Sequence, residues 1–103
     1  MPNILLSADG PIRAYSVPEE VYANLSDWID RFYDWMAHAP EAAALRQVFP
    51  SGTIGFRFTE EDFIMYLNSV AFPDQLSVLA EEMDADALSN LPNSFRNCPY
   101  YNF

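Results

Sequence analysis

The stretch Ser16–Pro40, SVPEEVYANLSDWIDRFYDWMAHAP, has the longest helical periodicity in this chain. At about 100° per residue, one arc of roughly 160° collects its large apolar and aromatic side chains. These are Val21, Tyr22, Leu25, Trp28, Ile29, Phe32, Tyr33, Trp35 and Met36. The opposite side carries the acids Glu19, Glu20, Asp27, Asp30 and Asp34. The pattern predicts one dominant amphipathic helix over about residues 17–39, with an aromatic buried face and an acidic outer face.

Local signals support the start of this helix. Ser16 followed by Glu19 has the spacing of a capping box. Pro18 fits the first turn, because the N–H that proline lacks would have no helical partner there. Asp27 and Arg31 are four residues apart and predict an ion pair on the exposed flank.

A hairpin is predicted at the N-terminus. Two runs with apolar residues, 3–8 and 11–15, flank the dipeptide Asp9-Gly10, whose residues tolerate positive φ. Pro11 cannot donate a ladder hydrogen bond, so it must start its strand or face an open edge. Residues 53–58, TIGFRF, alternate apolar and polar side chains and predict a further strand of the same sheet.

Shorter helices are predicted in the rest of the chain. Residues 41–49 and 73–91 have helical spacing, and the second stretch is either continuous or broken near residues 84–86. Residues 59–71 admit two interpretations: a helix with a Thr59–Asp62 capping box, or a hairpin that turns at TEED. We favour the helix, because TEED lacks the Gly or Asn of a tight hairpin.

Together these patterns predict a single compact domain over residues 1–103 with an α+β fold. The dominant helix and two or three shorter helices pack on a small antiparallel sheet. The aromatic C-terminal tail, NSFRNCPYYNF, is expected to be irregular and to pack on the body or on a partner. The core is expected to contain Trp28, Phe32, Leu25, Ile29, Phe56, Phe58, Leu67 and Leu79.

The charge balance restricts the classes of partner. Fifteen carboxylates face five arginines and no lysine, and the net charge is −10. Direct binding to a nucleic-acid backbone or to anionic lipid is not expected, since both need a basic patch. A basic protein partner is compatible with this charge, although acidity also serves solubility alone.

The same composition bears on location and cofactors. The chain contains no apolar run of membrane-spanning length, and its first ten residues do not resemble a signal peptide, so a cytoplasmic location is expected. The single Cys98 allows no internal disulfide. We find no phosphate-binding, dinucleotide or metal motif, and we expect no cofactor and no metal.

The residue types give little support for a catalytic function. His38 is the only histidine, and helical spacing places it beside Asp34, so an Asp34–His38 dyad is the one enzymatic hypothesis. A solvated histidine at a helix end explains the same pattern. We therefore predict that the protein is not an enzyme.

The acidic face of the long helix is the sharper candidate site. Its carboxylates span roughly 20 Å at a rise of 1.5 Å per residue, and a row of this kind imitates a phosphate backbone. Aromatic residues beside it suit interface anchors. The candidate partner-binding residues are Glu20, Asp27, Asp30, Asp34, Tyr33 and Trp35.

Two hypotheses of function follow. The first is a small acidic, non-enzymatic protein-binding module, an inhibitor or immunity-type protein that blocks a basic site on a nuclease or another nucleic-acid-handling protein. The alternative is a structural or oligomerising subunit that uses aromatic side chains at a homodimer interface.

Overall fold

A computed structural model describes all residues of the chain, 1–103. Its helices are α1 (Glu19–Ala23), α2 (Leu25–His38) and α3 (Glu60–Tyr66). Its strands are β1 (Asn3–Ser7), β2 (Ile12–Ser16), β3 (Arg46–Val48), β4 (Ile54–Phe56), β5 (Val78–Met83) and β6 (Tyr100–Asn102). Short 3₁₀ turns cover Pro40–Leu45, Ala85–Ser89 and Asn93–Phe95, and a π-helical segment covers Leu67–Ala71. The predicted α+β class is confirmed.

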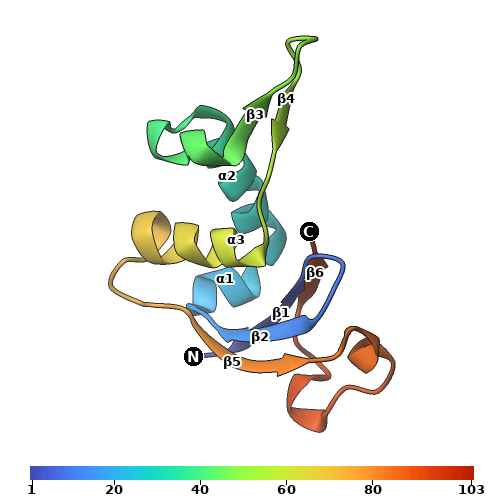
Figure 1. Ribbon diagram of the computed structural model, residues 1–103. Coiled ribbons are helices and arrows are strands. Elements are labelled where there is room, and N and C mark those ends of the chain that lie inside the picture. The colour runs from blue at the N-terminus through green and yellow to red at the C-terminus, as the bar shows by residue number, and fades with distance from the viewer.

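A four-stranded sheet in the order β5-β2-β1-β6 forms the centre of the fold (Figure 1). The predicted N-terminal hairpin is confirmed: β1 and β2 pair antiparallel, and Asp9 in the connection has a φ of 58°. Pro11 lies just before β2, so its missing N–H interrupts no ladder. The sheet is mixed rather than purely antiparallel, because β6 runs parallel to β1.

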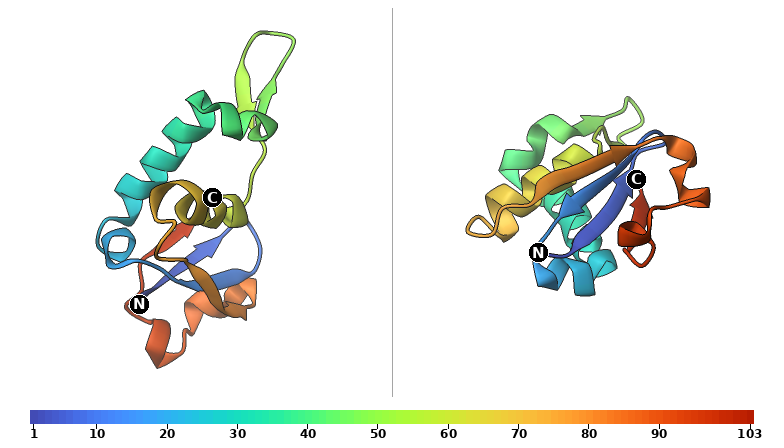
Figure 2. Two further views of the ribbon diagram at one scale, coloured as in Figure 1. Left: turned by 90° about the vertical axis from the view of Figure 1, so that its left-hand side faces the viewer. Right: turned by 90° about the horizontal axis from the view of Figure 1, so that it is seen from below.

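The sheet is covered on both faces, as two views show (Figures 1 and 2). Ile4 and Leu6 of β1 pack on the helical side, in a cluster that contains Phe32 of α2 and Phe63 of α3. Leu5 points to the other face, where Phe95 from the C-terminal segment covers it. Because both faces of β1 are buried, its apolar residues are consecutive instead of alternating.

The dominant helix is split in two, which corrects the predicted single helix over 17–39. Asn24 leaves the helical region with φ −139° and ψ 49°, and it separates α1 from α2. Asparagine competes for nearby backbone hydrogen bonds and is therefore a common point of interruption. Ser16 belongs to β2 and caps no helix; Pro18 occupies the N-cap position instead. The predicted buried face is confirmed at Leu25, Ile29, Phe32 and Met36.

The start of α3 confirms the helical interpretation of residues 59–71. The Thr59 hydroxyl accepts from the Glu61 backbone N–H at 3.3 Å, and the Thr59 N–H donates to Asp62 Oδ2 at 2.9 Å. These two bonds complete the capping box. The helix continues into the π-helical segment, where Phe72 N–H donates to Leu67 O at 2.7 Å.

Three other segments differ from the prediction. Residues 41–49 form a 3₁₀ turn and then β3, which pairs with β4 in a separate two-stranded sheet. TIGFRF therefore does not join the N-terminal hairpin, and Phe56 is exposed rather than in the core. Within residues 73–91, β5 replaces the predicted helix, because it pairs along β2 and gains a ladder of backbone hydrogen bonds. Leu79 of β5 is consequently exposed.

The C-terminal tail packs on the body, but as a strand. Ser7 Oγ lies 2.7 Å from the Tyr100 hydroxyl and donates to Asn102 Oδ1 at 2.8 Å. Asn102 Nδ2 donates to Asp9 Oδ1 at 2.9 Å, and Phe103 N–H donates to Ser7 O at 2.8 Å. These bonds join the end of the chain to the β1–β2 connection.

Candidate partner-binding surface

The outer side of α2 carries a row of three carboxylates, Asp27, Asp30 and Asp34, all exposed. Positions i, i+3 and i+7 fall on one side of a helix, so three of the four carboxylates of the predicted row lie in line along α2. The row extends about 10 Å from Asp27 to Asp34 at a rise of 1.5 Å per residue. Glu20 is also exposed but lies on α1, beyond the break at Asn24, so it does not continue the row in line.

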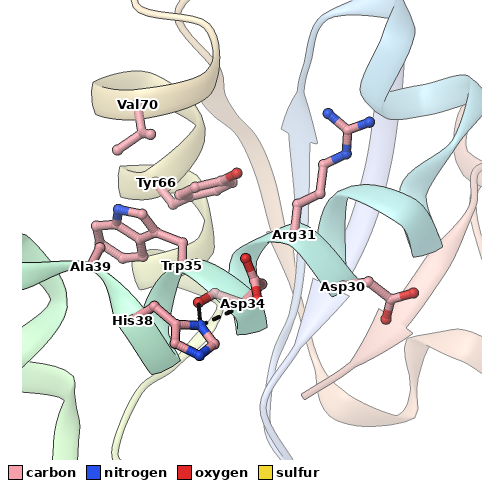
Figure 3. A pocket seen from close by; sticks show the side chains of 8 residues that line it. All are labelled: Asp30, Arg31, Asp34, Trp35, His38, Ala39, Tyr66 and Val70. Atoms are coloured by element: carbon pink, nitrogen blue, oxygen red, sulfur yellow. Dashed lines mark hydrogen bonds and ion pairs between the residues drawn. The ribbon is translucent and has the colours of Figure 1, made fainter.

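Asp30 and Asp34 border an open groove between α2 and the end of α3, shown in Figure 3. Its volume is about 600 Å³. We call it the α2 groove, and the residues that line it are Asp30, Arg31, Asp34, Trp35, His38, Ala39, Tyr66 and Val70. A second hollow of about 560 Å³ shares Trp35, Ala39 and Val70 with it and continues past Met65. The two form one surface with apolar walls and an acidic rim.

Trp35 is the aromatic centre of this surface. Its ring lies 5.2 Å from that of Tyr66 and 6.3 Å from that of Phe32, so the core supports it from behind. Trp35 itself remains half-buried and borders both hollows. Burial raises the pKa of the Tyr66 hydroxyl above its ordinary value, so this group is neutral near pH 7. A rigid, half-exposed aromatic side chain in a hollow is a common anchor in protein interfaces.

Tyr33 lies on the other flank of α2 and is not part of the α2 groove. Its ring packs edge-on against Phe58 at 5.6 Å. Burial, followed by the neighbouring Tyr101 hydroxyl, raises the pKa of Tyr33 to about 12. The six sequence-predicted residues therefore separate: Asp30, Asp34 and Trp35 line the groove, whereas Glu20, Asp27 and Tyr33 do not.

No arginine forms an ion pair with the acidic row, and Arg31 lines the groove together with Asp30 and Asp34. Arg13 is held by Glu60, Glu61 and Glu82, and Arg46 donates to the carbonyls of Met36 and Ala39 at the end of α2. The predicted Asp27–Arg31 ion pair does not form, because the Arg31 guanidinium lies 4.5 Å from the Trp28 ring centroid. Asp27 and Asp30 form no ion pair.

The Asp34–His38 pair is present but exposed. His38 Nδ1 lies 3.3 Å from Asp34 Oδ1 and 3.0 Å from the Asp34 backbone oxygen. Both side chains face solvent, and no serine, threonine or cysteine lines the groove beside them (Figure 3). Ser69 lines the adjoining hollow, which shares Trp35 and Val70 with the groove.

The chain offers no other obvious chemical centre. No group of three His, Cys, Asp or Glu side chains is arranged to hold a metal ion. Cys98 is half-buried, and burial raises the pKa of its thiol, which opposes formation of a reactive thiolate. No helix has the length and apolar character needed to cross a membrane.

Sequence reasoning missed Tyr66, Val70 and Met65 as members of the candidate surface. The sequence predicts a helix after Thr59, but no pattern in the sequence places that helix beside Trp35. The π-helical turn over Leu67–Ala71 contributes Val70 to the groove, and such turns recur at functional sites. No protein-family model, curated protein or solved structure matches this chain.

Proposed function

We propose that this protein is a small, acidic, non-enzymatic binding module that docks a basic protein partner through the α2 groove. The partner is a nuclease or another nucleic-acid-handling protein, whose basic site the module blocks in the cytoplasm. The observation that carries the proposal is the position of Asp30 and Asp34 on the rim of a groove that contains the half-buried Trp35.

This combination suits a partner that presents arginine or lysine next to an apolar side chain. The groove accepts the apolar group, since Trp35, Ala39 and Val70 line it. The rim carboxylates accept the cation through charge-assisted hydrogen bonds. Interfaces of this kind obtain affinity from a few aromatic anchors and obtain rate and selectivity from complementary charge.

The carboxylate row supports the choice of a nucleic-acid-handling partner. Asp27, Asp30 and Asp34 succeed one another along α2 at intervals of about 5 Å, from the 1.5 Å rise. Phosphates of one strand of duplex DNA follow at about 3.4 Å along the axis, so the carboxylates form a comparable but sparser row. A basic channel that binds a phosphate backbone would thus meet a similar row of negative charges on this protein.

The test is affinity capture from a lysate of the source cell. The full chain, its Asp30→Asn/Asp34→Asn variant and its Asp84→Asn/Asp86→Asn variant are immobilised separately, and retained proteins are identified by mass spectrometry. Asp84 and Asp86 are exposed and lie outside the α2 groove, so the last variant is matched in charge. We expect the wild-type chain to retain a basic nucleic-acid-handling protein. A higher salt concentration should release this protein.

The comparison between the two variants decides the outcome. Capture should fall several-fold for Asp30→Asn/Asp34→Asn and stay unchanged for Asp84→Asn/Asp86→Asn. Retained proteins that are all neutral or acidic and indifferent to salt would remove the basis of the proposal. An equal loss for both variants would show that total charge, and not the groove, governs capture.

A further inference from the structure

The β3–β4 hairpin projects from one end of the molecule, away from the four-stranded sheet (Figures 1 and 2). It exposes large apolar side chains: Val48 is 70% exposed, Ile54 53% and Phe56 37%. A two-stranded hairpin on its own is only marginally stable in water, and a contiguous apolar patch on such an element is a candidate contact surface.

These three side chains lie on one face of the hairpin. Val48 is directly opposite Ile54, and Phe56 is two residues further along β4, so all three point the same way. The other face carries Gln47, which is directly opposite Gly55, and the ring of Phe49, which is 44% exposed. This ring covers Gly55 so closely that a Cβ there would lie 2.7 Å from Phe49 Cε2.

The charge of the hairpin differs from that of the rest of the chain. Residues 42–59 contain two arginines, Arg46 and Arg57, and no carboxylate, so they carry +2 in a chain of net charge −10. Two copies of so acidic a protein repel each other wherever carboxylates meet. The apolar face can still meet its own copy, because Arg46 is held by the Met36 and Ala39 carbonyls and Arg57 follows Phe56 on the opposite face of the hairpin.

We propose that the hairpin is a self-association surface, on which a second copy of this chain packs its own Val48, Ile54 and Phe56. A two-fold axis brings the two apolar faces together, in the self-complementary arrangement of isologous dimers. The acidic bodies then point away from each other. The proposal does not depend on the proposed function, because the hairpin contributes none of the residues that line the α2 groove.

The expected dimer is weak and reversible. The three side chains expose on the order of 300 Å² per copy, given about 150–250 Å² for a large side chain. A standard stable interface buries about 800 Å² per partner. The interface is therefore expected to have a dissociation constant in the micromolar range, about 1–100 µM.

Sedimentation equilibrium of the full chain from about 5 to 200 µM tests the proposal. Wild-type protein should change from monomer to dimer over this range. Ile54→Lys should raise the dissociation constant at least about tenfold, because it places a charge in the apolar face. Gln47→Lys adds the same charge on the opposite face of the same hairpin and should leave the constant within about threefold.

A second measurement does not depend on any variant. Backbone amide NMR spectra of the wild type at low and high concentration should show shifts that concentrate in residues 46–56. A wild-type protein that stays monomeric throughout would overturn the proposal. So would concentration-dependent shifts that concentrate along β5, or a Gln47→Lys effect as large as that of Ile54→Lys.

Discussion

The ring centroids of Trp35 and Tyr66 lie 5.2 Å apart, with an angle of 47° between the ring planes. This contact joins α2 to the end of α3 and forms a wall of the α2 groove. Tyr66 is buried and Trp35 is half-buried, so the pair connects the core to the candidate surface. Trp35 is therefore expected to contribute to both stability and partner binding.

Trp35→Ala should lower the free energy of unfolding by about 2 kcal/mol, less than for a fully buried tryptophan. It should also weaken binding of the captured partner at least about tenfold, as for an aromatic anchor. Urea denaturation and isothermal titration calorimetry measure the two effects. Tyr33→Ala is the control: it removes an aromatic ring from the other flank of α2 and should destabilise without weakening binding. Equal losses of affinity for Trp35→Ala and Tyr33→Ala would contradict the assignment of the α2 groove as the partner-binding surface.

Arg13 and Glu60 form a partly buried ion pair, with Arg13 Nη1 2.5 Å from Glu60 Oε1 and only 6% of the Glu60 side chain exposed. Arg13→Met leaves that carboxylate without its cation and should cost about 3 kcal/mol in urea denaturation. Glu61 also contacts Arg13, but its side chain is 69% exposed. Glu61→Gln should therefore lower the free energy of unfolding by less than about 0.5 kcal/mol. An Arg13→Met/Glu60→Met double variant that is no more stable than Arg13→Met alone would argue against this explanation.

The two capping positions that the sequence indicates should behave differently. Thr59→Ala removes an acceptor that the structure uses at the start of α3, and should cost about 1 kcal/mol. Ser16→Ala should cost under about 0.5 kcal/mol, because Ser16 caps no helix. Thermal or urea denaturation of both variants provides the comparison. A larger loss of stability for Ser16→Ala than for Thr59→Ala would contradict this assignment. It would indicate that Ser16 caps the helix that follows it, as the sequence alone predicts.

Stability should decline in alkaline solution as tyrosines ionise. The pKa of Tyr33 is raised to about 12 in the folded protein from an ordinary value near 10, and burial also raises the pKa values of Tyr15 and Tyr66. A raised pKa means that the folded state keeps its proton after the unfolded state has lost it. The contribution to stability is complete below about pH 10 and is lost as the pH rises towards about 12.

Urea denaturation near pH 9 and near pH 11, alongside absorbance titration of tyrosinate, measures this decline. Tyr33→Phe should be less sensitive to pH than the wild type over that interval, because one of the shifted hydroxyls is gone. An identical decline in the wild type and in Tyr33→Phe would contradict the role given to Tyr33.

Local signals predicted those parts of the fold that local physics decides. The 3.6-residue period identified the buried face of α2 at Leu25, Ile29, Phe32 and Met36, and the Thr59–Asp62 spacing identified the start of α3. Asp9-Gly10 identified the N-terminal connection, where Asp9 adopts positive φ. Each of these features depends on neighbours within a few residues.

Pairing between distant segments was not predictable in the same way. Val78–Met83 carries helix-compatible spacing, yet it forms β5 because the edge of β2 offers a backbone ladder. Tyr100–Asn102 pairs with β1 from the other end of the chain. The α2 groove has the same origin, since it exists only because α3 and the π-helical segment bring Tyr66 and Val70 beside Trp35.

The most direct test of the central claim is a competition measurement with the basic partner that affinity capture identifies. A fluorescent DNA duplex of about 20 base pairs is bound to that partner, and this protein is titrated in at fixed ionic strength. We predict that the protein releases the DNA and that Asp30→Asn/Asp34→Asn needs at least about tenfold higher concentration to do so. A ternary complex that retains the DNA, or equal potency of the variant and the wild type, would contradict the proposal that the acidic rim of the α2 groove occupies a nucleic-acid site.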